Sequence, residues 1–502
     1  MAASGVIETR PGAAERQPRA LPTIFFTEMW ERFSYYGMRA LLVLYLVNAL
    51  GYERGHALEV YGLYTGLVYL SPLAGGWLAD RYLGTRKAVL IGGITMALGH
   101  FAMAFEPLLY LGLGLLIAGN GFFKPNMATL LGSLYRENDP RRDGGFTIYY
   151  MGVNLGAFFS PLVAGTLGEK VGWHYGFASA GVGMCLGIAQ FLWGQERLGD
   201  AGMRDGRTRL DARDWLHVVV ISALMVPLVY AVMALWGFIG PVWDPLSGLV
   251  KTAIVVAIIA VLWFAGHVRA KGHVEAGNEP LTAQEWQRII AILVMGFFVI
   301  FFWMGFEQAG GTMNLFADKL TDRDLLGWEI PASYFQAINP LAILALGPVM
   351  AALWLRIDTS RFALPTPAKM AFGLVFLALG FVVLAIGDAR AQAVGKVGAQ
   401  WLTIVYLLHT VGELCLSPVG LSMVTRLAPA RVAALMMGIW YLANAAANYL
   451  AGILEELLKG SAIPLYWFLV GSSLGAAIVL FAITPILKRL MHDKPHPLRA
   501  RG

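Results

Sequence analysis

Cysteine and charged residues are the two classes that this sequence has least of. Only two of the 502 residues are cysteine, Cys185 and Cys415, and each lies inside an apolar stretch. This excludes a disulfide framework and does not suggest a metal site. Charged residues make up only 14% of the chain, whereas a soluble domain has about 25%. The composition therefore excludes an ordinary soluble protein.

The signatures of several enzyme classes are also missing from the sequence. It has no serine–histidine pair, no histidine-rich metal cluster and no nucleotide-binding loop, and the glycines at 181–187 lie inside an apolar span with no strand before them. We therefore expect neither an enzyme nor a bound cofactor. Residues 1–20 are polar and are not followed by a short apolar region with a cleavage site, so no removable signal peptide is predicted.

Hydrophobic residues are what the sequence has in excess, at 57% of the chain. They form runs of roughly 20 residues or more, the length that crosses a bilayer as a helix. This pattern predicts an all-α, multi-pass membrane protein surrounded by lipid. Fourteen membrane-spanning helices are expected, at residues 21–49, 57–80, 87–105, 107–132, 145–168, 173–193, 215–238, 246–267, 286–317, 331–355, 366–387, 398–426, 431–458 and 463–488.

The distribution of basic residues predicts the orientation of these helices. With the N-terminus inside, the cytoplasmic segments hold 27 Lys and Arg residues and the outer loops hold 7. Because basic residues are retained on the cytoplasmic side, this bias places both termini in the cytoplasm. The same bias accounts for the net charge of +6, so no nucleic-acid partner is expected.

Two short segments of the chain recur about 290 residues later. Residues 149–157 (YYMGVNLGA) resemble 439–447 (IWYLANAAA), and 122–134 resemble 415–427, at nearly equal offsets. This repetition predicts two six-helix bundles with a substrate site at their interface near the membrane midplane. We expect a cytoplasmic tail at 1–20, an N-terminal bundle at 21–193, a linker with two extra helices at 194–285, a C-terminal bundle at 286–490 and a cytoplasmic tail at 491–502.

The first predicted helix carries four charged residues where lipid is expected. Glu28, Arg32, Tyr35 and Arg39 fall on one stripe at helical spacing, and Glu31 lies beside it. A charge at the centre of a membrane helix costs at least about 2.5–3.5 kcal/mol on insertion scales. Glu28 and Arg32 can pair at i, i+4, so Glu31 and Arg39 need partners on other helices. Two interpretations of these four charges stay open: a buried structural salt-bridge cluster, and a hydrated pathway with a proton site.

Three further charged residues lie well inside predicted spans: Lys124, Glu307 and Glu413. All the intramembrane cations are then in the first half, and the second half offers two carboxylates and no cation. This asymmetry suits a ligand with a negative and a positive end. Taken alone, Glu307 is also compatible with a satisfied structural carboxylate.

Uncharged polar residues extend this set into other apolar helices. For any single one of them, a hydrogen bond to a neighbouring helix is the favoured interpretation. They are Tyr35, Tyr36, Tyr69, Asn154, Asn339 and Asn444.

Three motifs in the chain, taken in order, resemble those of the proton-dependent oligopeptide transporters, a family of the major facilitator superfamily. Residues 28–37 (EMWERFSYYG) resemble the family's helix 1 hallmark, 75–84 (GGWLADRYLG) its loop signature after helix 2, and 146–158 (FTIYYMGVNLGAF) its helix 5 signature. With the lysine and glutamates of helices 4, 7 and 10, the resemblance covers nearly the whole chain. The inserted helix pair resembles the bacterial branch of the family.

The resemblance implies a symporter that imports di- and tripeptides with protons across a bacterial inner membrane by alternating access, with no cofactor and no obligate protein partner. It implies that Arg39 and Lys124 face the peptide carboxylate, that Glu413 faces its amino terminus, and that Glu28, Glu31, Arg32 and Glu307 handle the proton. Asn154 and Asn339 are implied to bond the peptide, with Asn444 a less defined contact, and Tyr35, Tyr36, Tyr69, Trp303 and Trp440 to line pockets.

One departure from the family bears on coupling. Animal members carry a helix 2 histidine seven residues before the position of Tyr69, where this chain has Gly62. Proton coupling must then depend on carboxylates. Arg39 and Glu307 can meet across the two halves, where a substrate carboxylate competes with Glu307 for Arg39.

The rival interpretations are a symporter for nitrate or amino acids, a channel and a membrane-embedded enzyme. Nitrate has no positive end, so it leaves Glu413 without a role. Charges that pair across the two halves disfavour an open channel.

Overall fold

The structure is a computed structural model that describes residues 16–136, 139, 141–203, 209–243, 281–360, 363–429 and 432–492. The predicted spans are found as helices throughout these ranges. The predicted span 246–267 lies outside the described residues. Nine helical segments of the described chain are long and apolar enough to cross a membrane.

The helices of the first half follow the predicted order, with short 3₁₀ or π turns (η) at several ends. They are α1 (Leu21–Asn48), α2 (Arg54–Leu78), η1 (Ala79–Leu83), α3 (Thr85–Met103), η2 (Glu106–Leu108), α4 (Leu109–Ser133), α5 (Arg142–Thr166), η3 (Leu167–Val171), α6 (Trp173–Trp193) and η4 (Gln195–Leu198). The first inserted helix follows as α7 (Ala212–Trp243).

The second half, like the first, has six long helices in the described residues, and a break separates the first of them, α9, from the short helix α10. It contains α9 (Ala283–Phe306), η5 (Glu307–Gly310), α10 (Thr312–Leu320), η6 (Ala332–Ala337), α11 (Ile338–Thr359), α12 (Thr366–Val394), α13 (Gln400–Leu427), α14 (Ala433–Leu457) and α15 (Leu465–Met491). Four two-residue strands complete the described loops: β1 (Thr321–Asp322) pairs in parallel with β4 (Val397–Gly398), and β2 (Asp324–Leu325) pairs antiparallel with β3 (Trp328–Glu329).

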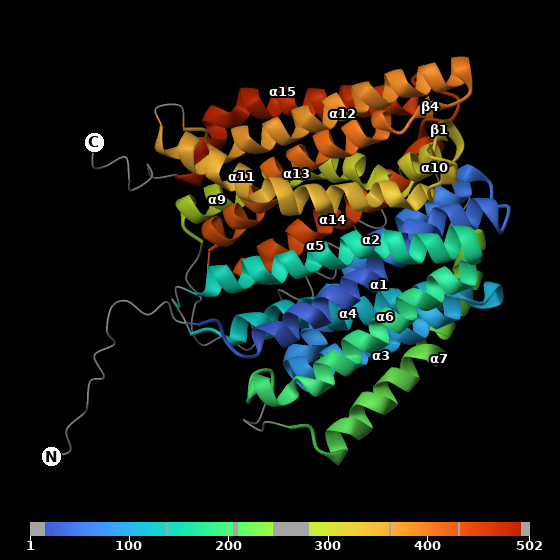
Figure 1. Cartoon of the computed structure of the whole chain (residues 1–502). Coiled ribbons are helices and arrows are strands. Elements are labelled where there is room, and N and C mark those ends of the chain that lie inside the picture. Colours follow the sequence, from blue (N-terminus) through green and yellow to red (C-terminus); the bar gives the residue numbers. More distant parts are fainter. Residues whose placement is uncertain are drawn as a thin grey trace.

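Each half packs mainly within itself. In the first half α1 lies along α5 and α6, and α4 lies along α2 and α3. In the second half α12 lies along α13 and α15, and α9 lies along α14 and α15. Figure 1 shows the first half, in blue to green, below the second half, in yellow to red, with α7 on the outside of the first half against α3 and α4. The expected domain boundaries stay predictions.

The two halves meet along two pairs of helices, α2 with α14 and α5 with α11 and η6. Helix α1 runs from Leu21 at one end of the molecule to Asn48 at the other. Among the described residues, every hydrogen bond and ion pair between the halves lies between the level of Arg39 and the Asn48 end. Asn48 bonds Asp318 at 3.0 Å and Lys319 at 2.8 Å, and Arg54 contacts Glu455 at 2.8 Å. The structure therefore shows the conformer whose halves are joined at that end.

Glu169 makes the most unusual of these contacts. Its carboxylate, in η3 between α5 and α6 of the first half, accepts hydrogen bonds from the backbone N–H groups of Ala332 and Ser333, at 2.7 Å and 3.0 Å. These N–H groups begin η6 and have no partner within the helix, and a negative charge is favoured at a helix N-terminus. One half thus caps a helix of the other, so separating the halves at this end breaks the cap.

A network of loop charges surrounds this cap. Arg323 contacts Glu329 at 3.0 Å and Asp318 at 3.3 Å, and Lys170 of the first half donates to Glu329. Arg323 and then Lys170 hold the pKa of Glu329 below its usual range. Glu329 therefore keeps its negative charge, and its contact with the first half, well below neutral pH.

Gly62 of α2 lies directly against Gly452 of α14, backbone to backbone. A Cβ atom built on Gly62 would lie 2.6 Å from the Gly452 Cα, a distance at which one helix must shift. No side chain therefore fits between α2 and α14 at the position of Gly62 in this conformer. The small residues here let two helices from different halves approach closely.

We expect Gly62→Ala to lower the melting temperature of the detergent-purified protein. Gly296→Ala in α9 is the matched control, because a Cβ there meets nothing within 4 Å and alanine favours a helix over glycine by about 1 kcal/mol. Overpacking at Gly62 costs about 1–3 kcal/mol, which outweighs that gain. If both variants melt at the same temperature, the backbone contact between α2 and α14 is not present.

Candidate functional site

Toward the Leu21 end of α1, the charged stripe contains an ion-pair cluster of one arginine and two glutamates. Arg32 Nε lies 3.0 Å from Glu28 Oε1 and 2.5 Å from Glu31 Oε2, and all three side chains are buried. The predicted i, i+4 pair is confirmed. Glu31 differs from the expectation, since its closest ionic partner is on its own helix; Asn120 of α4 adds a longer hydrogen bond of 3.4 Å.

This cluster has an excess of one acidic group. With both glutamates ionised, one guanidinium balances only one of them, and a buried unbalanced charge is costly. Glu28 Oε2 and Arg32 Nη2 have no hydrogen-bond partner among the described residues. Lys124 of α4 also acts electrostatically on both glutamates, so the charge of this cluster is balanced by two cations, of which only Arg32 is in direct contact.

Arg39, two turns further along α1, forms the ion pair that joins the halves. Its Nη2 lies 2.5 Å from Glu307 Oε2, and both side chains are buried. The prediction that Arg39 and Glu307 can meet across the halves is confirmed. Because the pair is removed from water, neither charge has bulk solvent as an alternative partner, and each is held by the other.

Tyr61 of α2 is a member of this site that the sequence reasoning missed. Its hydroxyl accepts a hydrogen bond from Arg39 Nε at 2.7 Å. On the other side the hydroxyl fills the space where a Cβ of Gly310 would lie. Tyr61 is eight residues before Tyr69, about two helical turns, and that spacing was the available signal. The tyrosine holds one edge of the Arg39 guanidinium and leaves the other edge for a carboxylate.

Glu307 lies where the predicted span 286–317 breaks. It ends α9 and begins the single turn η5, and Gly310 and Gly311 separate that turn from α10. The sequence predicted one continuous helix, and the structure shows two. The adjacent glycines and the Tyr61 hydroxyl packed against Gly310 account for the break. Irregular backbone at membrane depth is tolerated only where protein or a cavity covers it, which marks this turn as part of the site.

The second half supplies a further buried carboxylate, Glu413 of α13. Asn339 of α11 donates to Glu413 Oε2 at 2.8 Å and to the Thr410 hydroxyl at 3.0 Å. No cation lies within ion-pair distance of Glu413 among the described residues. Its charge therefore stays available for a positive group, and Thr410 is a second residue of the site that sequence reasoning missed.

Lys124 of α4 faces an aromatic ring rather than a carboxylate. Its Nζ lies 4.2 Å from the centroid of the Tyr69 ring, and Arg39 lies over Tyr36 at 5.7 Å. Tyr35 and Tyr36 pack edge to face. The structure thus gathers the predicted cations and tyrosines of the first half around the Arg39–Glu307 pair, with Lys124 free of any ion pair in the described part of the chain.

Other predicted site residues are not brought into this arrangement by direct contact. Asn154 and Asn444 each donate to a backbone carbonyl one turn earlier in their own helices, at 2.9 Å. Trp303 packs edge to face against Phe306, one turn before Glu307. Trp440 is buried against Gly420. Their implied roles in peptide binding stay predictions.

Comparisons with known proteins cover the chain almost end to end. Residues 86–467 match the POT family. The uncharacterized transporter YclF of Bacillus subtilis is 36% identical over 94% of this chain and 95% of the relative. The peptide transporter YePEPT of Yersinia enterocolitica is 31% identical over 95% of this chain and 96% of the relative.

A solved structure agrees with this result at the level of the fold. The crystal structure of a peptide transporter POT in complex with sulfate is similar to this chain with a TM-score of 0.79 and 36% identity, over 96% of this chain and 97% of that one. Sequence, fold and the order of the motifs point to one family. The chain belongs to the POT family of transporters, multi-span membrane proteins with the major facilitator fold.

Proposed function

We propose that this protein imports di- and tripeptides together with protons by alternating access. The observation that carries the proposal is the ion pair between Arg39 of the first half and Glu307 of the second. A substrate carboxylate that reaches Arg39 must displace Glu307, and in doing so it acts on the contact between the halves. The related peptide transporters support a peptide as that substrate.

The two ends of a peptide find complementary groups in the two halves. Arg39 and Lys124 supply positive charge for the carboxylate, and Tyr61 keeps the Arg39 guanidinium in place when Glu307 leaves it. Glu413, held by Asn339 rather than by a cation, supplies negative charge for the amino terminus. Nitrate, the alternative substrate, carries no positive end and leaves Glu413 without a partner.

Coupling to the proton follows from the cost of an unpaired Arg39. Removing one partner of a buried ion pair costs about 3–5 kcal/mol, so protonating Glu307 without a peptide is disfavoured. A peptide carboxylate restores the missing charge, and protonation of Glu307 removes its competitor. Each ligand therefore favours the other, as linkage requires, and the halves are released only when both are bound.

The cluster of Glu28, Glu31 and Arg32 is the second proton site of the proposal. It shares α1 with Arg39, so a change of charge in the cluster acts on the helix that carries the peptide-binding cation. Protons are the only coupling ion proposed; no cofactor, catalytic activity or obligate protein partner is part of the function. The charge bias of the loops supports cytoplasmic termini, and the bacterial relatives support the inner membrane as the location.

Glu307→Gln separates two activities that the wild-type protein joins. In proteoliposomes the variant is expected to lose peptide uptake driven by a pH gradient but to retain peptide-for-peptide exchange, because glutamine mimics the protonated carboxyl and cannot titrate. Glu106→Gln, on an exposed turn, is the matched control and should keep both activities.

The same two assays on Glu28→Gln and Glu31→Gln test the competing account, in which the α1 cluster alone carries the proton. On that account Glu307→Gln still accumulates peptide against a gradient, and only the α1 variants are uncoupled. That outcome would remove Glu307 from the coupling mechanism.

Capped peptides test which charge binds which end. Glu413→Gln should lose most of its preference for a free amine over an N-acetylated peptide while still preferring a free carboxylate over an amide; Lys124→Ala should show the reverse pattern. A hydrogen bond to a charged group contributes about 1.5–3 kcal/mol, so each lost preference corresponds to roughly ten- to hundredfold in competition against a labelled dipeptide. Variants that lose both preferences equally would contradict the two-ended assignment.

A further inference from the structure

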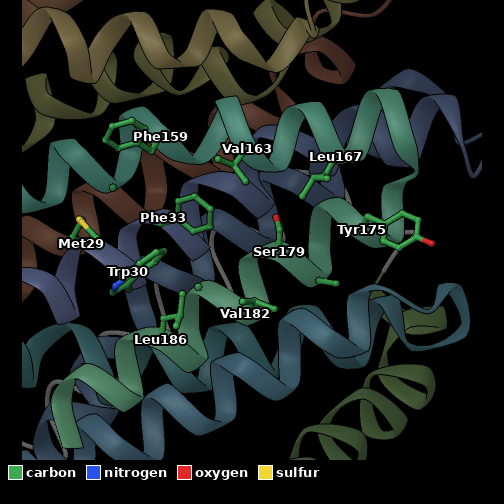
Figure 2. A pocket seen from close by; sticks show the side chains of 13 residues that line it. Met29, Trp30, Phe33, Phe159, Val163, Leu167, Tyr175, Ser179, Val182 and Leu186 are labelled. Carbon is green, nitrogen blue, oxygen red and sulfur yellow. The ribbon is translucent and has the colours of Figure 1, made fainter. Parts of the chain in front are cut away.

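One unfilled space in the described structure does not belong to the transport site. A groove with a volume of about 610 Å³ lies between α5 and α6, with α1 as its floor. Figure 2 shows Met29, Trp30 and Phe33 on the floor and residues of α5 and α6, including Val163 and Val182, along the walls. The floor is the side of α1 opposite the charged stripe.

The groove faces out of the bundle and not toward the second half. Phe159 and Val163 on its α5 wall are 46% and 42% exposed, and Val182 on its α6 wall is 51% exposed. Gly165 and Thr166 of α5 contact the second half, and neither lines the groove. Since α5 and α6 are both membrane-spanning, the medium at the mouth of the groove is the bilayer.

The chemistry of the lining excludes a peptide or water as the occupant. Its side chains are aliphatic or aromatic apart from the hydroxyls of Ser179 and Tyr175. Ser179 already donates to the Gly176 carbonyl at 2.6 Å, and Tyr175 lies at one end. An apolar space of this kind does not hold water, which needs several polar partners, and a charged peptide end would lose its solvation there.

The length of the groove matches one leaflet of a bilayer. From Tyr175, near the start of α6, to Leu186 the helix rises about 16 Å at 1.5 Å per residue, and half of the hydrocarbon core is about 15 Å. Trp173, His174 and Tyr175 gather at the outer end, where aromatic residues favour the membrane interface. The groove thus runs from the interface to the midplane, as an acyl chain does.

Glycines create the space. Gly168 and Gly176 bring the ends of η3 and α6 within close contact, since a Cβ on Gly176 would lie 2.8 Å from the Gly168 Cα. Gly183 then lets Phe33 lie against α6, because a Cβ there would be 2.6 Å from the Phe33 ring. The two walls meet at one end, and between them Met29 and Trp30 of the floor stay partly exposed.

We propose that this groove binds one acyl chain of a bilayer phospholipid, seated against Trp30 and Phe33. The acyl chain packs against the apolar side of the α1 segment that carries Glu28, Glu31 and Arg32. It covers the apolar surface that α5 and α6 leave exposed. The proposal does not depend on which solute the protein carries.

The test uses the tryptophan on the groove floor as a reporter. The protein is reconstituted in vesicles of phosphatidylcholine, plain or brominated at the middle of the acyl chain, and the Trp30 signal is the difference in fluorescence between wild type and Trp30→Phe. The Trp30 signal should be strongly quenched by the brominated lipid. Ala178→Phe, which fills the groove from its α6 wall, should protect Trp30 from quenching.

Ala189→Phe is the matched control, on the same helix and exposed but outside the groove, and it should leave the quenching unchanged. Ser179→Leu, a second groove-filling change, replaces Ala178→Phe if that variant fails to fold. The wild-type protein and Ala189→Phe should also retain one phospholipid in native mass spectrometry from detergent, and the groove-filled variant should lose it. An unquenched Trp30, or equal protection by both phenylalanine variants, would overturn the proposal.

Discussion

The organisation of this protein depends on one buried ion pair, Arg39 with Glu307. Its cation belongs to the first half and its carboxylate to the second, so the pair is at once a ligand site and a bond between the halves. The surrounding features serve to place it: Tyr61 fixes the arginine, and the break between α9 and α10 presents the glutamate. A substrate that competes for Arg39 therefore acts directly on the conformational equilibrium.

The distribution of buried charge extends the same logic. Arg32, Arg39 and Lys124, the three cations predicted well inside spans, all lie in helices of the first half, and the α1 cluster pairs one arginine with two glutamates. The second half holds Glu307 and Glu413, which differ in partner: an arginine for one and an asparagine amide for the other. One carboxylate is thus already occupied and must be displaced or protonated, whereas the other is ready for an amine. This division favours a two-ended ligand over a simple anion.

Much of this was predictable from the sequence because charge inside a membrane is costly and therefore conspicuous. The spans, the α1 stripe, the Glu28–Arg32 pair and the meeting of Arg39 with Glu307 all follow from hydropathy, helical spacing and charge balance. Tyr61 and Thr410 did not, because an uncharged residue in an apolar helix has no local signal of its partner. The break at Glu307 and the contact of Gly62 with Gly452 also depend on packing between segments far apart in sequence.

The account is tested most directly by counting the protons that bind with the substrate. Calorimetric titration with a dipeptide, at one pH in buffers of different ionisation enthalpy, gives the number of protons taken up per peptide bound. If the peptide carboxylate displaces Glu307 from Arg39, wild type takes up close to one proton near neutral pH, and Glu307→Gln takes up markedly fewer. Equal proton uptake in the two proteins, or none in wild type, would contradict the exchange of partners at Arg39.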